Sequence, residues 1–309
     1  MISRRNIRVK VMQLLYMMDA GKGDNAIKNP VAELEKSFEK TKELLVYLLY
    51  FTTEVARYAE TDAVKKANKH LPTLEDLNVN TKLAGNELLW QIVENESFKK
   101  AVEKVKPENL INPDFLKRIY NNLVASSEYQ LYINAQSREK QKEKEILRFI
   151  FTNLMLPDEV FTSHLEELFN NWDDDCEMMD QMVNNYLSKP NGYNLQEIIS
   201  EEKWAFAKSL LISTYNKRQY LLDLIKPKLQ NWDSERIASL DMVLMQMGVC
   251  EFLYFETIPT KVTINEYIDL AKEYSTEQSG FFVNGILDNI HKELAQADKL
   301  NKIEFKQKK

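Results

Sequence analysis

The spacing of apolar residues near the start of the chain predicts an amphipathic helix over about residues 4–18. The apolar positions that share one helical face are Ile7, Val11, Leu14, Leu15 and Met18. At about 100° per residue, Arg4, Arg5 and Arg8 fall in an arc beside this face. We therefore expect a helix that buries one side and holds three guanidinium groups at the edge of the core.

The same helical spacing continues through the middle of the chain. A second, long helix is expected to include residues 44–58, and several more follow between about residues 68 and 190, where prolines separate them. The sequence Lys-Pro-Asn-Gly at 189–192 is the strongest single break and indicates the end of one structural part. After it, helices are expected at about 195–215 and 220–229.

The C-terminal part predicts three more helical segments. The first has an apolar stripe formed by Ile237, Leu240, Leu244 and Met247. Pro259 should end that helix, the next should run to about Tyr274, and residues 275–280 are expected to form a polar loop. The last helix carries Phe282, Val283, Ile286, Leu287, Ile290 and Leu294 on one side. No Asn-Gly or Asp-Gly turn lies between alternating apolar runs, so the predicted fold class is all-α.

Composition and charge argue against an enzyme. The chain of 309 residues has only seven glycines, whereas loops that cradle phosphates or dinucleotides need several at defined spacings. The net charge is −6, so the chain as a whole does not attract nucleic acid. The charge is uneven, however, because the first 18 residues hold three arginines and Lys10 and no acid. This distribution indicates a local anion-binding patch on an acidic protein.

The residue types that bind metals are present, but their spacing favours structural roles. The densest acidic cluster comprises Asp173, Asp174, Asp175, Glu177 and Asp180. It lacks the glycine and the bidentate acid of an EF-hand, and we interpret it as the first turn of a helix. The cysteines, Cys176 and Cys250, are far apart, as expected for unpaired thiols in a cytoplasmic protein. We therefore expect no metal and no cofactor. The longest apolar run, residues 44–51, is far shorter than the about 20 residues of a membrane span.

Short motifs at both ends of the chain resemble those of the NusB family. Residues 258–266 read IPTKVTINE, residues 270–272 read LAK, and residues 282–288 read FVNGILD. These blocks, at this spacing, are similar to the family's IPxKVAINE, ELAK and FVNGVLD. Near the start, RRNIR at 4–8 and QLLY at 13–16 resemble the arginine-rich first helix of the family.

The resemblance implies an all-helical protein of two packed bundles. It covers about the first 20 residues and residues 205–293, and the segment at about 60–195 matches no motif of the family. We therefore expect an N-terminal helical domain over residues 1–220 that is enlarged by a helical insertion at 60–195. The C-terminal helical domain is expected over residues 221–309.

The resemblance also implies a function, which is transcription antitermination without enzymatic activity. Family members bind the box A element of nascent RNA as a heterodimer with the ribosomal protein NusE, and the pair helps RNA polymerase to read through terminators in ribosomal RNA operons. The expected partners are therefore single-stranded RNA of the box A type, NusE and the antitermination complex of RNA polymerase. No membrane partner is expected.

Eight residues are expected to form the RNA site when the family pattern is carried onto this sequence. They are Arg4, Arg5, Arg8, Gln13, Tyr16, Tyr274, Gln278 and Phe282. Arginines on a rigid helix can bind phosphate oxygens in a bidentate manner, and aromatic rings can stack on splayed bases. The alternative is that the arginines are only solvated and that Phe282 packs in the core. Gln278 and Phe281 depart from the acidic and basic residues that the family often has at these positions.

The signature polar residues Asn265, Glu266 and Asn284 have two possible roles. A carboxylate beside an amide can serve acid–base chemistry, but no nucleophile, histidine or metal-ligand set accompanies them. Capping of helix ends and buried hydrogen bonding between helices are therefore the preferred roles.

Two other functional classes remain open. One is an interaction scaffold of the same fold that has lost RNA binding. The other is an RNA-modification protein, because some RNA cytosine methyltransferases carry a NusB-like domain before a catalytic one. Only about 24 residues follow Gly285, and Gly85 is the only glycine between Gly23 and Gly192, so we expect neither room nor a cofactor loop for that activity.

Overall fold

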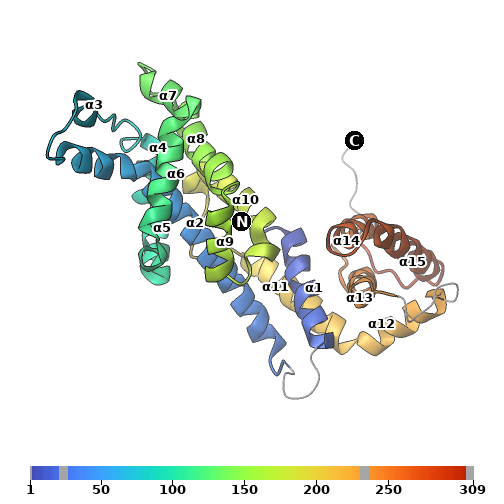
Figure 1. Cartoon of the computed structure of the whole chain (residues 1–309). Coiled ribbons are helices and arrows are strands. Elements are labelled where there is room, and N and C mark those ends of the chain that lie inside the picture. Colours follow the sequence, from blue (N-terminus) through green and yellow to red (C-terminus); the bar gives the residue numbers. More distant parts are fainter. Residues whose placement is uncertain (1, 21–26, 230–236, 304–309) are drawn as a thin grey trace. The chain divides into compact units, whose positions relative to one another are not determined.

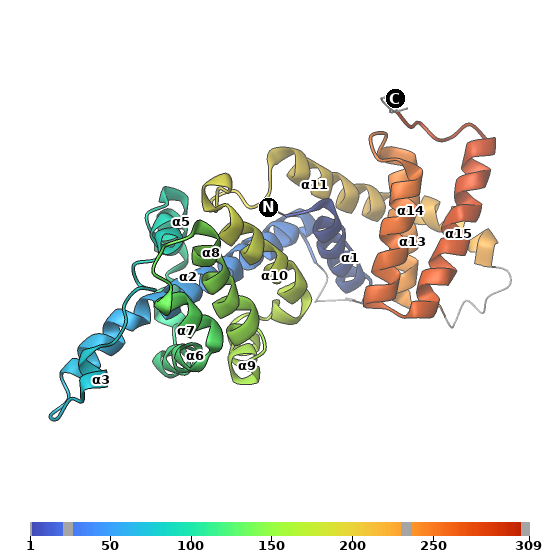
Figure 2. The ribbon, with the colours of Figure 1, turned by 90° about the horizontal axis from the view of Figure 1, so that it is seen from above.

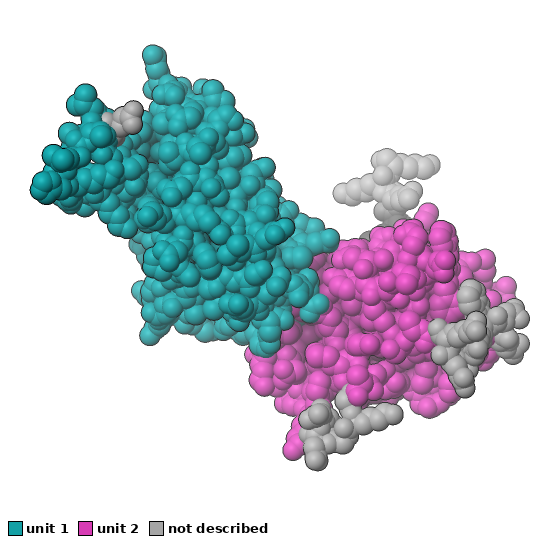
Figure 3. Space-filling model, viewed as in Figure 1, with its two compact units in different colours: residues 1, 38–198 teal, residues 2–37, 199–309 magenta. Residues whose placement is uncertain are grey.

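The computed structural model describes residues 2–20, 27–229 and 237–303, and every regular element in these ranges is a helix (Figure 1). The all-α prediction is therefore confirmed. Contacts within the chain divide it into two compact units (Figure 3). Unit 1 comprises residues 38–198, and unit 2 comprises residues 2–37 together with 199–309.

Unit 1 contains the whole segment that we expected to be an insertion. It starts within the long helix α2 (Pro30–Ala67). Its other helices are α3 (Leu74–Leu77), α4 (Glu87–Val93), α5 (Glu96–Val105), α6 (Pro113–Ala125), α7 (Ser127–Asn134), α8 (Lys140–Phe149), α9 (Glu159–Leu168) and α10 (Trp172–Ser188). A π-helical segment (Ile150–Met155) continues α8, and short 3-10 turns lie at Pro107–Leu110 and Pro190–Gly192.

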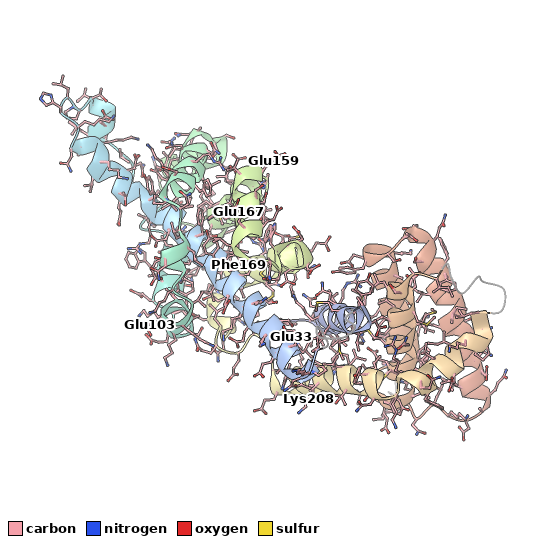
Figure 4. The ribbon with its side chains drawn as sticks, turned by 60° about the horizontal axis from the view of Figure 1, so that its bottom comes forward. Glu33, Glu103, Glu159, Glu167, Phe169 and Lys208 are labelled. Carbon is pink, nitrogen blue, oxygen red and sulfur yellow. The ribbon has the colours of Figure 1, made fainter. Side chains whose placement is uncertain are left out.

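The core of unit 1 is built around α2. The apolar run at residues 44–51 is buried except for Tyr50, because other helices of the unit cover α2 on most sides (Figure 2). The ring of Phe169, which is labelled in Figure 4, lies 5.2 Å from that of Tyr47. The ring of Phe51 lies 4.7 Å from that of Phe161. A run that is apolar all round a helix thus marks a central helix and not a membrane span. No helix among the described residues is long and apolar enough to cross a membrane.

Unit 2 joins the first helix of the chain to the last ones. Its helices are α1 (Arg4–Ala20), α11 (Glu201–Asn216), α12 (Arg218–Ile225), α13 (Ser239–Tyr254), α14 (Thr260–Tyr274) and α15 (Glu277–Gln296), with a 3-10 turn at Lys226–Leu229 and the first residues of α2. α14 and α15 form a helical hairpin that packs on α13. We expected a division near residue 220, but the contacts place α1 and α11 with the C-terminal helices, because α1 packs against both α11 and α13.

Two helix starts differ from the sequence-based prediction. α11 begins at Glu201 and not near residue 195, because the hydroxyl of Ser200 accepts a hydrogen bond from the backbone N–H of Lys203. α15 begins at Glu277, so most of the polar loop expected at 275–280 is helical. There, the hydroxyl of Thr276 accepts a bond from the N–H of Ser279 at 3.0 Å and caps the helix.

The C-terminal end of α13 is capped from a distant part of the chain. The ammonium of Lys302 donates hydrogen bonds of 2.7 Å to the carbonyl oxygens of Glu251 and Phe255, and the N–H of Ile303 donates to the carbonyl of Glu256. A helix leaves its last carbonyl groups without partners inside the helix, and a cation there also meets the negative end of the helix dipole.

Replacing Lys302 by methionine is therefore expected to lower the free energy of unfolding by about 1–2 kcal/mol, because two carbonyl oxygens lose a charged donor. Chemical denaturation followed by circular dichroism measures the change. The matched control is Lys299→Met, since the Lys299 side chain is exposed and the change should alter stability by less than about 0.5 kcal/mol. Equal effects of the two substitutions would contradict the capping role.

Candidate nucleic-acid interface

Helix α1 is more deeply enclosed than its sequence suggests. The hydroxyl of Ser3 accepts a bond from the N–H of Asn6 near its start. Eight of its residues are buried, namely Ile7, Arg8, Val9, Lys10, Val11, Met12, Leu14 and Leu15. A helix with a single partner would bury one stripe, whereas α1 packs on α11 and α13 and has a wider buried surface.

Arg8 lies inside this buried surface and only 2% of the residue is exposed. Its Nε donates to Oε1 of Glu251 at 2.7 Å, and one terminal nitrogen donates to Oε2 of the same carboxylate at 3.1 Å. The other terminal nitrogen donates to Glu266 at 3.2 Å. Arg8 therefore lies inside the core and not at its edge, as had been expected, and its donors bind the buried carboxylate of Glu251 and the half-buried carboxylate of Glu266.

Glu251 is the centre of a polar network inside unit 2. Its carboxylate is fully buried and also accepts bonds from the hydroxyls of Thr263, at 3.1 Å, and Tyr267, at 2.8 Å. Burial alone would lower the pKa of Arg8. The hydrogen bond and the charge of Glu251 raise this pKa by more than burial lowers it, so the pKa of Arg8 lies above its usual value. Burial and then the charge of Glu251 raise the pKa of Tyr267 well above 10.0. This network fixes the position of α1 against α13 and α14.

Arg4 and Arg5, by contrast, are partly exposed at the surface. Their side chains are 39% and 36% exposed. Arg4 pairs with Glu202 of α11 at 2.8 Å, and Arg5 pairs with Glu273 of α14 at 2.6 Å. Arg4 also lies over the ring of Phe206, with its Cζ 5.5 Å from the ring centre. Surface ion pairs contribute only about 0–1 kcal/mol, so these guanidinium groups could exchange a carboxylate for a phosphate at little cost.

Gln13 and Tyr16 lie further along α1. Gln13 is half-buried, and its amide nitrogen has no hydrogen-bond partner within the described part of the chain. Tyr16 is 42% exposed. Tyr16 follows Arg5 by eleven residues, which is about 16 Å along the axis and close to the same side of the helix. A ligand that reached both residues would therefore lie along α1.

The three predicted residues of the C-terminal hairpin lie around the turn between α14 and α15. Tyr274 is half-buried at the end of α14, next to the Glu273 that pairs with Arg5. Gln278 is exposed in the first turn of α15, and Phe282 is half-buried. Gln278 and Phe282 line one surface hollow of unit 2. The structure thus connects Arg5 with the end of α14 and places Gln278 beside Phe282 in the hollow.

Phe281 was noted in the sequence only as a departure from the family, yet it is the most exposed aromatic residue of this hairpin. It is 70% exposed, and the ammonium of Lys272 lies 5.8 Å from the centre of its ring. Phe281 lines the same hollow as Phe282. The core partners of α1, Phe206 and Glu251, were missed as well. A glutamate inside the apolar run of α13 was the available signal, because a buried carboxylate needs a charged partner.

The signature polar residues have different roles from one another. Glu266 accepts the bond from Arg8 on another helix, which confirms hydrogen bonding between helices for this residue. Asn265 and Asn284 are both exposed, so the buried role expected for them is wrong. They occupy the outer faces of α14 and α15, where the helical spacing turns them away from the core.

Three residues of the acidic cluster, Asp173, Asp174 and Asp175, lie in the first turn of α10 as predicted, and Glu177 and Asp180 follow further along the same helix. Asp175 is buried and accepts hydrogen bonds from Thr41 at 2.8 Å and from Asn171 at 2.7 Å. Within the described residues, no group of three or more His, Cys, Asp or Glu side chains could hold a metal ion. Burial raises the pKa of the Cys250 thiol to about 12, so this cysteine is not a thiolate at neutral pH.

The fold and these residues define a class of protein, an all-helical domain in which an arginine-bearing first helix packs on α11 and α13 and forms ion pairs with α14 of the C-terminal hairpin. The sequence profile of the NusB family matches residues 167–292, a segment that does not include α1. The chain belongs to the NusB family of transcription antitermination proteins. No solved structure matches the chain significantly.

Similar proteins carry the description "Transcription antitermination protein NusB". That of Finegoldia magna is 39% identical over 94 residues, which are 30% of this chain and 69% of the relative. That of Clostridium botulinum is 34% identical over 119 residues, which are 38% of this chain and 84% of the relative. That of Fervidobacterium nodosum is 47% identical over 79 residues, 26% of this chain and 56% of the relative. These proteins align with a minor part of the chain.

Proposed function

We propose that this protein is a cytoplasmic, non-enzymatic antitermination factor that binds box A-type RNA together with the ribosomal protein NusE. Its role would be to support transcription of ribosomal RNA as part of the antitermination complex of RNA polymerase. The observation that carries the proposal is the position of Arg4 and Arg5. Both guanidinium groups are partly exposed on a helix that Arg8 and Glu251 fix in place, both pair with surface carboxylates, and Arg4 also lies over the ring of Phe206.

The buried network and the surface arginines have separate tasks in this proposal. Arg8 would position α1 and would not touch RNA. Arg4 and Arg5 would contact phosphates, while Tyr16 and the aromatic residues near the hairpin turn would stack on bases. Gln13, Tyr274, Gln278 and Phe282 complete the proposed RNA site. Because arginine presents a planar set of donors, it can bind a phosphate through two hydrogen bonds.

The double substitution Arg4→Ala and Arg5→Ala is expected to weaken binding of labelled box A RNA by about 10- to 100-fold, because two phosphate contacts are lost. Fluorescence anisotropy at two salt concentrations, with and without NusE, measures the affinity. The slope of log K against log salt should become less steep by about 1–2. Arg8 stays unchanged in this variant, since its removal would disturb the core.

The matched control is Arg57→Ala combined with Lys99→Ala. It removes the same number of positive charges from surface ion pairs of unit 1. Arg57 pairs with Glu54 at 3.2 Å, and Lys99 pairs with Glu96 at 3.3 Å. This control should bind RNA as the parent chain does. Unchanged affinity of the Arg4 and Arg5 variant, with a normal thermal unfolding curve, would show that α1 is not the RNA contact.

A second candidate function is a NusE-binding scaffold without RNA affinity. One observation favours it, because Glu202, Asp269 and Glu273 already surround the two exposed arginines and reduce their local charge. Co-purification with NusE followed by RNA titration separates the two functions. A complex with NusE that gains no affinity for RNA would support the scaffold.

A further inference from the structure

Unit 2 of this acidic chain contains a short basic segment. Residues 203–228 include six lysines and arginines and a single acid, Asp223, whereas the whole chain has a net charge of −6. Asp223 accepts a hydrogen bond of 2.8 Å from the amide of Gln219. The segment comprises most of α11, all of α12 and most of the 3-10 turn that follows. Positive charge that is concentrated on one part of an acidic protein indicates a surface for an anionic partner.

Three of these six cations are free at the surface. Lys208, Lys217 and Lys226 are exposed and form no ion pair with any described residue. The other three bind carboxylates or a backbone carbonyl of unit 2. The two exposed arginines of α1, by contrast, each pair with a carboxylate. The free lysines can therefore bind a phosphate without first losing a partner.

Exposed aromatic rings accompany the free lysines. Tyr215 is 49% exposed at the end of α11, and Tyr220 is 43% exposed in the first turn of α12. Lys208, Ile212 and Tyr215 are spaced i, i+4 and i+7, which places them on one face of α11, and all three are exposed. An aromatic ring at the surface can stack on the flat face of a ligand, and lysines beside it can bind the ligand's negative charge.

Tyr254 extends this surface onto α13. It is 42% exposed, and α12 packs against α13. Burial, and then the proximity of Tyr220, raise the pKa of Tyr254 above its usual value. The two phenol rings therefore belong to one surface, and a neutral phenol does not repel a phosphate. We call the following six residues the α11–α12 surface: Lys208, Ile212, Tyr215, Lys217, Tyr220 and Tyr254.

The α11–α12 surface adjoins the end of α1. The guanidinium of Arg218 donates to both carboxylate oxygens of Asp19, at 2.7 Å for one of them. Asp19 follows Tyr16 by three residues, which is about one turn of α1. Tyr16 is the exposed aromatic residue of the proposed RNA site on this helix. A strand that lies along α1 from Arg5 to Tyr16 therefore arrives at the joint between α11 and α12.

We propose that the α11–α12 surface is a second contact site for single-stranded RNA, which binds nucleotides that flank the element held along α1. This inference rests on the proposed function, because α1 must bind the strand first. Lys208 and Lys217 contact phosphates, and the rings of Tyr215 and Tyr220 stack on bases. An acidic protein would use the lysines but would not need the exposed rings. Every base has a flat face, so the flanking nucleotides need no fixed sequence.

Fluorescence anisotropy with three labelled RNAs tests the second site in the full chain, with NusE present. One RNA contains only the box A element, and the other two extend it by about ten uridines at the 5′ or the 3′ end. At least one extended RNA should bind about tenfold more tightly than the short RNA. Its slope of log K against log salt should be steeper by about 1.4, because two more phosphates are contacted.

Two double variants should remove this gain. Lys208→Gln with Lys217→Gln should return the salt slope of the extended RNA to that of the short RNA. Tyr215→Leu with Tyr220→Leu should remove most of the gain in affinity, whereas Tyr215→Phe with Tyr220→Phe keeps both rings and should bind like the parent chain. No variant should change the affinity for the short RNA. All four positions are exposed, and circular dichroism verifies that the helices are intact.

The matched control for charge is Lys100→Gln with Lys117→Gln. These lysines of unit 1 are also exposed and form no ion pair within the described part of the chain, so the control should keep the full gain. Equal losses in the control and in the Lys208 and Lys217 variant would overturn the second site.

The RNA lengths separate this inference from the proposed function. Extended RNAs that bind no more tightly than the short RNA would overturn the second site and leave the proposed function intact. A chain that binds none of the three RNAs would overturn both. Binding of labelled polyglutamate that depends on Lys208 and Lys217, with no gain from the uridines, would indicate an acidic protein partner and would also overturn the second RNA site.

Discussion

Replacing Glu251 by alanine is expected to lower the free energy of unfolding by about 3–5 kcal/mol, because the buried Arg8 then loses its main counter-charge. The hydroxyls of Thr263 and Tyr267 lose their acceptor at the same time. Glu266 stays in place, but the single bond of 3.2 Å that Arg8 donates to this partly exposed carboxylate does not replace its two bonds to a buried one. Urea denaturation followed by circular dichroism measures the loss.

Two further variants make this prediction specific. Glu273→Ala removes a carboxylate that binds Arg5 at the surface and should cost less than about 1 kcal/mol. The double variant Arg8→Met with Glu251→Leu should recover most of the stability that each single change loses, since no unpaired charge remains in the core. A Glu251→Ala variant as stable as Glu273→Ala would show that the network does not hold α1 in place.

The second large effect is expected at Gly248 of α13. A Cβ atom at this position would lie 2.9 and 3.0 Å from the methyl carbons of Leu287 and 3.4 Å from the ring of Tyr267. The substitution Gly248→Val is therefore expected to lower the free energy of unfolding by about 2–3 kcal/mol, because α13 must move away from α14 and α15. The absence of a side chain is what allows these helices to approach closely.

Gly285 provides the matched control, because it also lies inside a helix but has no atom within 4 Å of the position of a Cβ. Gly285→Val should change stability by less than about 0.5 kcal/mol, with a slight gain from the better helix propensity of valine. Both variants undergo the same change in propensity, so the difference between their unfolding free energies isolates the packing effect. A difference below about 1 kcal/mol would contradict the close approach at Gly248.

The sequence was sufficient to predict the fold class and the order of most helices. The apolar residues of α1, α13 and α15 recur at helical spacing, and Pro259 separates α13 from α14 as predicted. The start of α15 was misplaced because Thr276 and Ser279 are polar residues typical of loops. The hydroxyl of Thr276 in fact caps the helix and shares a hydrogen bond with the hydroxyl of Ser279, and a cap and a loop have similar composition.

The position of Arg8 could not be read from the spacing of α1 alone. A helical wheel places Arg4, Arg5 and Arg8 in one arc, but it does not say how many partners the helix has. α1 packs on two helices, α11 and α13, so that Arg8 is buried while Arg4 and Arg5 stay at the surface. The separation depends on Glu251, which is 243 residues away in the sequence. Long-range charge pairing of this kind has no local signal beyond a glutamate in an apolar helix.

Unit 2 consists of two segments of the chain, with residues 38–198 between them. This arrangement has a consequence for synthesis on the ribosome. At about 5–20 residues per second, the ribosome needs about 8–30 s to synthesise the intervening residues. During that time α1 has already been made, but its packing partners α11 and α13 have not. Unit 1 is a continuous segment and can fold first. The arginine-bearing surface therefore matures only after residue 251 has emerged, so premature nascent chains would carry an unassembled first helix with its apolar face open to chaperones.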